Sequence, residues 1–256
     1  MTKLSQVLKV TLREQLRMLT KTFLFYLLVV LVSFILSMFS GAARKVWSAS
    51  LLANIAGWSA LFMIVYFIRL ALSSKNFMKS NRFRLIPIAT SKLYIANLLT
   101  ILLGSIYVEV IHFILLMLSL VVAFFVIPGA VINGFDYRVL LNGDFISGSS
   151  GSLLLGLLSP ILIIILFHLI DFTSSLILNY IPGGAQKLVK VIIYILVMVI
   201  AVYVISDIVH LIYLIFAGNF LNDLNLIWIN MTLVGLGLII FSGINIMLLK
   251  KVETVF

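Results

Sequence analysis

The sequence has no cysteine among its 256 residues, and only 10% of its residues are charged. Without cysteine, the chain can form neither disulfides nor thiolate metal sites. Hydrophobic residues make up 63% of the chain, whereas a soluble domain of this size needs far more polar surface. The composition therefore predicts an integral membrane protein.

Common catalytic and nucleotide-binding motifs are also missing. The sequence has no Gly-x-x-x-x-Gly-Lys-Ser/Thr loop, so it does not bind ATP through a loop of that kind. It has neither Gly-x-Ser-x-Gly nor His-Glu-x-x-His, the motifs of common hydrolases and zinc proteases. The polar segments also leave no room for a soluble catalytic domain. We therefore predict that the chain is not an enzyme and carries no cofactor of its own.

Six apolar runs are candidates for membrane spans. A helix needs about 20 apolar residues to cross a bilayer, and lipid forces the backbone to satisfy its own hydrogen bonds. The runs cover residues 23–39, 51–72, 93–126, 153–180, 188–205 and 227–249. We predict an all-α polytopic protein with one transmembrane domain over residues 1–256.

The positive charges predict the orientation of these spans. With both termini in the cytoplasm, fifteen of the 18 Lys and Arg residues lie inside, and only Arg44, Lys45 and Arg138 lie outside. Cytoplasmic loops of membrane proteins are enriched in these residues, so the asymmetry favours this orientation. The net charge of +10 is explained by orientation and by contact with lipid headgroups, and it gives no support to nucleic-acid binding.

Residues 1–21 have the pattern of a helix that lies in the cytoplasmic interface. Leucines recur at helical spacing along one face, from residue 4 to residue 19. Lys9, Arg13, Arg17 and Lys21 follow at intervals of four on a different face. Such a helix places its leucines in lipid and its cations at the headgroups. We expect the chain to turn after it into the first span.

Two segments are predicted on the outer side. Residues 127–152 are rich in Gly and Ser, which is typical of a loop. Residues 206–226 contain an apolar stretch that is too short to span, so we predict a re-entrant or interfacial hairpin there.

The cytoplasmic connection at residues 73–92 is strongly basic. Six Lys or Arg residues and no acidic residue lie between Arg69 and Lys92. The connection contains an amphipathic run at 77–86, which ends at Pro87. It is therefore a candidate docking surface for a cytoplasmic partner, or alternatively a basic segment that contacts only lipid headgroups.

Two pairs of ionisable residues fall inside predicted spans. Glu109 and His112 share one face of the third span, and His168 and Asp171 share one face of the fourth. Ionisable groups cost about 2.5 to 3.5 kcal/mol each at the centre of a span, so each needs a reason. Three interpretations remain open: a hydrogen-bonded cluster that fixes helix packing, a proton or substrate relay, and a metal site.

The residues that open the third span carry a resemblance to a known family. Residues 85–94 read Leu-Ile-Pro-Ile-Ala-Thr-Ser-Lys-Leu-Tyr. They are similar to the Leu-Pro-Ile/Val segment, followed by small and basic residues, of permease subunits of ABC-2-type ABC transporters. The layout resembles that family too, with six spans, an interfacial N-terminal helix, a coupling helix between spans two and three, and an outer hairpin before span six. The usual acidic residues and the Gly-Thr pair upstream of the proline are absent here.

This resemblance implies a mechanical role. Two permeases, identical or related, would pair in a bacterial plasma membrane and bind two P-loop ATPase subunits that hold the ATP and Mg²⁺. The loop would dock into the ATPase through the apolar and basic residues Phe77, Lys79, Arg82, Phe83, Arg84 and Leu85. Small permeases of this kind often export peptides or lipophilic compounds, including in self-protection against bacteriocins.

Two functions of other classes remain as alternatives. One is an intramembrane metal-dependent enzyme that uses Glu109, His112, His168 and Asp171. The other is a non-catalytic immunity protein that binds a partner in the membrane.

Overall fold

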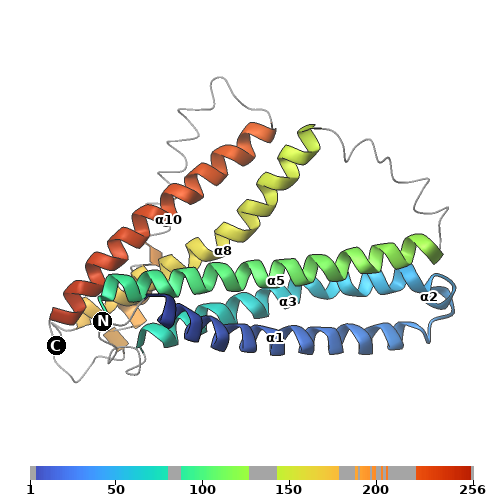
Figure 1. The fold of residues 1–256 in the computed structure, drawn as a ribbon, viewed down its shortest axis with the longest axis horizontal. Helices are drawn as coiled ribbons and strands as arrows, with labels where there is room; N and C mark the ends of the chain where they lie inside the picture. Colours follow the sequence, from blue (N-terminus) through green and yellow to red (C-terminus); the bar gives the residue numbers. More distant parts are fainter. Residues whose placement is uncertain are drawn as a thin grey trace. The chain divides into compact units, whose positions relative to one another are not determined.

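A computed structural model describes residues 4–79, 88–126, 143–178 and 223–254, together with residues 188–189, 191–196, 198–199, 203 and 206. These ranges are built of helices and contain no strand, which confirms the predicted all-α class. The labelled helices are α1 (Leu4–Ser37), α2 (Gly41–Lys45), α3 (Trp47–Lys79), α5 (Thr90–Val126), α8 (Gly143–Leu178) and α10 (Asp223–Thr254) (Figure 1).

Five of these helices, all except α2, are long and apolar enough to cross a membrane. The chain is therefore a multi-pass membrane protein. The predicted span at 188–205 is described only in short helical pieces. Of the hairpin predicted at 206–226, residues 207–222 lie outside the described residues, and the last four residues belong to α10. The count of six spans and the hairpin stay predictions.

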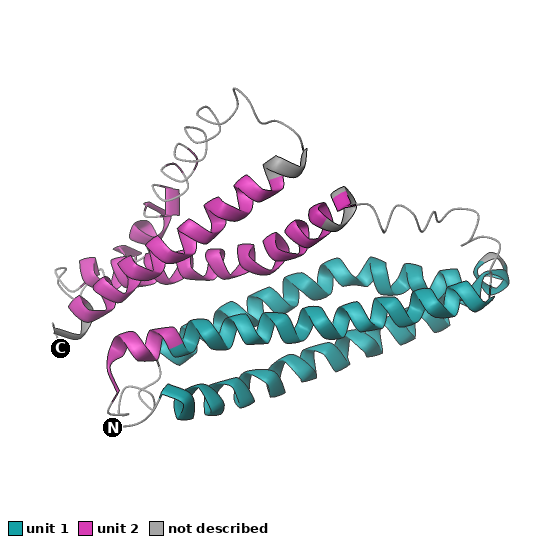
Figure 2. Ribbon diagram, turned by 45° about the horizontal axis from the view of Figure 1, so that its top comes forward, with its two compact units in different colours: residues 1–87, 96–142 teal, residues 88–95, 143–256 magenta. Residues whose placement is uncertain are grey.

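The chain forms two compact units, which are coloured separately in Figure 2. The first unit contains residues 1–87 and 96–142, and so holds α1, α2, α3 and most of α5. The second unit contains residues 88–95 and 143–256, and so holds the first turns of α5 together with α8 and α10.

Helix α1 is continuous, so the expected turn between an interfacial helix and the first span is not present. No Gly or Pro interrupts its 34 residues, which make a helix about 51 Å long. Its N-terminal half is also tied to α5 by side-chain hydrogen bonds. Thr11 and Thr100 bond through their hydroxyls at 3.0 Å, and Thr20 bonds Tyr107 at 2.8 Å. The four predicted surface cations of α1 are all exposed.

Helix α3 runs antiparallel to α5 in a regular register. Tyr66 Oη donates to Ser105 Oγ at 2.7 Å, and Asn97 Nδ2 donates to Ser74 Oγ at 2.8 Å. A step of eight residues forward on α3 therefore matches a step of eight residues back on α5. Helix α1 pairs with α3 through the hydroxyl of Tyr26, which donates to the carbonyl of Ile55 at 2.8 Å.

Helix α8 begins at Gly143, ten residues before the predicted span and within the segment predicted as an outer loop. The Gly and Ser residues there belong to the helix, and two of them, Ser147 and Gly151, pack against α10. Trp228 Nε1 of α10 donates to Ser147 Oγ at 3.1 Å, and a side chain at Gly151 would meet Ile227. Small residues permit close helix contact in membranes, so composition alone misread this stretch as a loop.

Candidate functional site

The predicted docking residues lie at and beyond the end of α3. Phe77 belongs to the last turns of α3 and is buried, with 9% of its surface exposed. Lys79 is the last residue of that helix. The other four, Arg82, Phe83, Arg84 and Leu85, lie outside the described residues. The structure therefore places Phe77 among the buried residues of α3. The docking role of the loop stays a prediction.

Glu109 and His112 share helix α5 in the first unit, as their spacing predicted. His112 is buried, with 7% exposed, and its ring centroid lies 6.0 Å from those of both Tyr26 and Phe62. Tyr26 and Phe62 themselves stack at 4.5 Å. His112 Nε2 has no hydrogen-bond partner. The imidazole thus lies beside two aromatic rings. Its Nε2 is buried without a hydrogen bond, which costs free energy of folding.

His168 and Asp171 share helix α8 in the second unit, and both are buried. The ring of His168 stacks on Phe172 at 5.9 Å and meets the edge of Tyr94 at 5.8 Å. Asp171 accepts a hydrogen bond from the Tyr194 hydroxyl. This pair is therefore part of a network of aromatic and hydroxyl groups within its own unit.

The centre of that network is a residue that the sequence reasoning did not single out. Asn245 of α10 is fully buried, and its Nδ2 donates at 2.9 Å both to Tyr94 Oη and to the carbonyl oxygen of Ile165. Tyr94 is equally buried. The available signal was an asparagine inside a predicted span, because an amide in lipid needs partners on neighbouring helices.

The two ionisable pairs belong to different units. Among the described residues, no group of three or more His, Cys, Asp or Glu side chains is arranged to hold a metal ion. What the structure does place around each pair is aromatic: Tyr26 and Phe62 beside His112, and Tyr94 and Phe172 beside His168.

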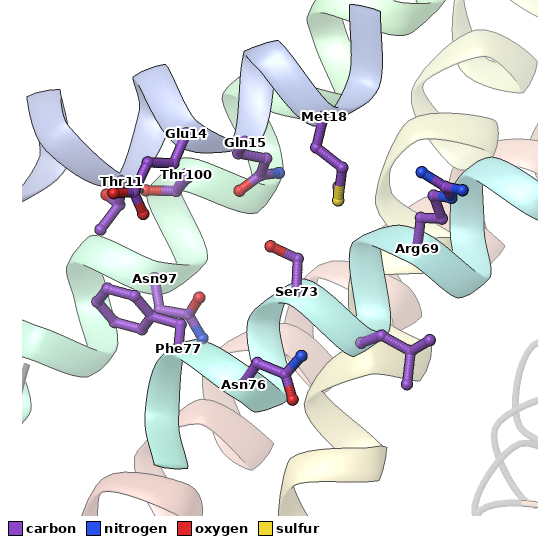
Figure 3. Close-up of a pocket in the computed structure, with 11 residues that line it drawn as sticks. Thr11, Glu14, Gln15, Met18, Arg69, Ser73, Asn76, Phe77, Asn97 and Thr100 are labelled. Carbon is purple, nitrogen blue, oxygen red and sulfur yellow. Dashed lines mark hydrogen bonds between the residues drawn. The ribbon is translucent and has the colours of Figure 1, made fainter. Parts of the chain in front are cut away.

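A cavity of about 520 Å³ opens among α1, α3 and α5 within the first unit (Figure 3). Its lining includes Gln15 from α1, Ser73 and Asn76 from α3, and Asn97 and Thr100 from α5. All five of these side chains can donate or accept hydrogen bonds, in contrast to the apolar composition of the chain as a whole.

The sequence reasoning missed this cavity, although a signal for it was present. Each of the three helices brings two polar residues three or four positions apart, which places them on one helical face. These pairs are Thr11 with Gln15, Ser73 with Asn76, and Asn97 with Thr100. Helix packing decides which of these polar faces meet. The sequence pattern of one helix does not predict which other helix its polar face will contact.

Comparison of this chain with known protein families, with curated proteins and with solved structures finds no match. The residues and the structure of the chain itself are therefore the only indications of its function.

Proposed function

We propose that the chain is the membrane-spanning permease subunit of an ATP-driven ABC transporter of the ABC-2 type. It exports a peptide, a lipid or another amphipathic compound across a bacterial plasma membrane, with both termini in the cytoplasm. ATP and Mg²⁺ bind a separate P-loop ATPase subunit, and a second copy or a paralogue of the permease completes the complex.

One observation carries this proposal: the connection from α3 to α5 is basic and amphipathic, with no acidic residue between Arg69 and Lys92. A membrane chain that has no nucleotide-binding loop needs an external source of energy to drive transport. An apolar and basic loop on the cytoplasmic side supplies a surface of the kind that docks a partner, with apolar anchors for affinity and charges for specificity.

The charge distribution of the first unit supports the orientation. Its hydrogen-bond register brings the start of α1, the end of α3 and the start of α5 to one end of the unit. Six cations lie in the half of the unit at that end, and two lie in α2 at the other end. The six are Lys9, Arg13, Arg17, Arg69, Lys75 and Lys79, and the two are Arg44 and Lys45. The end with more cations faces the cytoplasm by the rule for loop charges.

The polar contacts between α3 and α5 support the mechanical step. The loop joins these two helices, and hydrogen bonds at Ser74 with Asn97 and at Tyr66 with Ser105 hold them together along about twelve Å. A push on the loop by a closing ATPase is then passed to both helices as one body. Such movement of packed helices is how a small local change becomes a change in access.

Affinity purification of the tagged chain from its native cell in mild detergent tests the proposal. We expect a stoichiometric P-loop ATPase to co-purify, and we expect Phe83→Glu or Arg84→Glu to remove it, because each places an acid at the docking surface. Arg138→Glu is the matched control, since it makes the same charge change in the predicted outer loop.

Retention of the ATPase by Arg138→Glu but not by Arg84→Glu assigns the loop. If no ATPase accompanies the wild-type chain under conditions that preserve other membrane complexes, the permease proposal is wrong.

A further inference from the structure

The cavity of the first unit has a polar floor that its own residues leave incompletely satisfied. Gln15 lines the cavity and is 94% buried, because only 6% of its surface is exposed. Its Nε2 has no hydrogen-bond partner and lies against Gly104, where any side chain would collide with it. A buried amide without a partner costs about 1 to 3 kcal/mol. A half-turn of the amide about its terminal bond would present this donor to the cavity.

The rim of the cavity carries one charge of each sign. Glu14 of α1 and Arg69 of α3 are both exposed and both line the cavity. Figure 3 shows their side chains at opposite ends of it, with Ser73 between them. A cavity with separated opposite charges and neutral donors on its floor suits a zwitterion better than an ion of one sign.

The depth of the cavity favours a membrane ligand. On α1 it lies at residues 11–18, just before the apolar run at 23–39, and on α3 it lies at 69–77, where the run at 51–72 ends. Exposed cations of α1 flank it at the same level. This is the level at which lipid headgroups meet a membrane protein. Met18 and Phe77 add apolar wall beside the polar floor.

We propose that this cavity binds a phosphoethanolamine group, carried by a phospholipid or free in solution. The Arg69 guanidinium takes the phosphate, because its fork of donors matches two phosphate oxygens. The Glu14 carboxylate accepts hydrogen bonds from the ammonium group, and the Gln15 amide donates to a phosphate oxygen. The assignment does not depend on the permease function.

Native mass spectrometry of the full chain tests this, after purification in detergent with equal amounts of phosphatidylethanolamine, phosphatidylcholine and phosphatidylglycerol. We expect phosphatidylethanolamine to be retained over the other two lipids. Arg69→Gln and Glu14→Gln should each weaken that retention about tenfold, the effect of losing one charge-assisted hydrogen bond. Gln15→Leu should lower it as well. Arg13→Gln and Arg17→Gln are matched controls, because these exposed cations of α1 lie outside the cavity lining.

Competition with soluble phosphoethanolamine separates the two sources. Displacement of the lipid by the soluble compound shows that the headgroup alone is recognised, whereas persistence of the lipid shows that its acyl chains contribute. Both results agree with the proposal. Equal retention of the three lipids overturns it, and so does selectivity that survives the substitutions at all three cavity residues in chains that elute as folded protein.

Discussion

The two units hold their helices together in different ways. In the first unit, polar contacts are spread along three helices, and most of them join hydroxyl groups, as at Thr11 with Thr100 and Thr20 with Tyr107. In the second unit, α8 and α10 are apolar over long stretches, and one fully buried amide, Asn245, makes two of the described interhelical bonds.

The difference teaches where each unit is sensitive. Interhelical hydrogen bonds in membranes are worth about 0.6 kcal/mol on average. The first unit has several such bonds along three helices, so it should tolerate the loss of one hydroxyl pair. A buried group that bonds two acceptors on other helices loses both of those interhelical bonds when it is removed, and a net hydrogen bond is worth up to about 1.5 kcal/mol. We therefore expect single substitutions to have larger effects at the centre of the second unit.

The largest effect is expected from Asn245→Leu. The change removes both donors and leaves Tyr94 Oη and the carbonyl of Ile165 buried without their present partner. We expect the free energy of unfolding to fall by about 3 kcal/mol, measured by denaturant titration in mixed micelles. Asn54→Leu is the matched control in the first unit. Asn54 is half-buried and accepts from Ser33, so it should cost about 0.6 kcal/mol. Equal losses would remove the contrast between the units.

Gly104→Leu should come next, because it sets how closely α1 approaches α5. A side chain there would collide with the Gln15 amide and touch Leu19. Overpacking of this kind costs about 2 kcal/mol, which a lower midpoint of thermal unfolding in detergent would report. Gly57→Leu introduces the same side chain where nothing lies within 4 Å. A similar loss at both glycines would point to a general intolerance of bulk in place of a close contact.

His112→Phe should have a smaller effect of opposite sign. The phenyl ring fits among Tyr26 and Phe62 and removes the unsatisfied Nε2, so we expect a gain of about 1 kcal/mol in the free energy of unfolding. His112→Gln keeps a polar group there and should give no gain. If His112→Phe folds normally but abolishes transport, the imidazole has a role in proton or substrate transfer, and packing alone does not explain it.

The smallest effect is expected from the loss of a single hydroxyl pair of the first unit, Thr11 with Thr100. Thr11→Val and Thr100→Val keep the shape of each side chain and remove one partner of a 3.0 Å hydrogen bond. A double-mutant cycle should give a coupling energy of about 0.6 kcal/mol. Thr11→Val combined with Thr232→Val, at an exposed position of α10, should give no coupling. A value above about 2 kcal/mol would place this pair among the strongest in membranes. It would contradict the view that many weak hydrogen bonds hold the first unit together.

The sequence predicted that the apolar runs form helices, but it misplaced several of their ends. Runs of apolar residues report where lipid can surround a helix, so the core of each of the five long helices was found. Their ends depend on packing. Helix α8 begins at Gly143 because small residues there let α10 approach, with Trp228 bonded to Ser147. Helix α1 continues through residue 21 because Thr11 and Thr20 bond to α5.

The candidate sites show the same division. Spacing correctly placed Glu109 with His112, and His168 with Asp171, on single helices. It did not reveal that Tyr26 and Phe62 enclose His112, because those residues lie on other helices. The cavity was missed for the same reason, since its polar lining is shared among three helices.

What the sequence determined by itself is the class of this protein: a cysteine-free, all-helical chain with apolar runs long enough to span a bilayer and with its cations gathered near particular ends of those runs. These properties follow from one-dimensional patterns, because the transfer of each residue into lipid depends mainly on that residue. The tertiary structure alone decided which polar groups satisfy one another and which do not. The Nδ2 of Asn245 found two acceptors while its Oδ1 found no donor, and Gln15 and His112 each keep a buried nitrogen without a partner. The physical reason is that a hydrogen bond needs a donor and an acceptor about 3 Å apart, and only the packing of helices distant in sequence sets that distance.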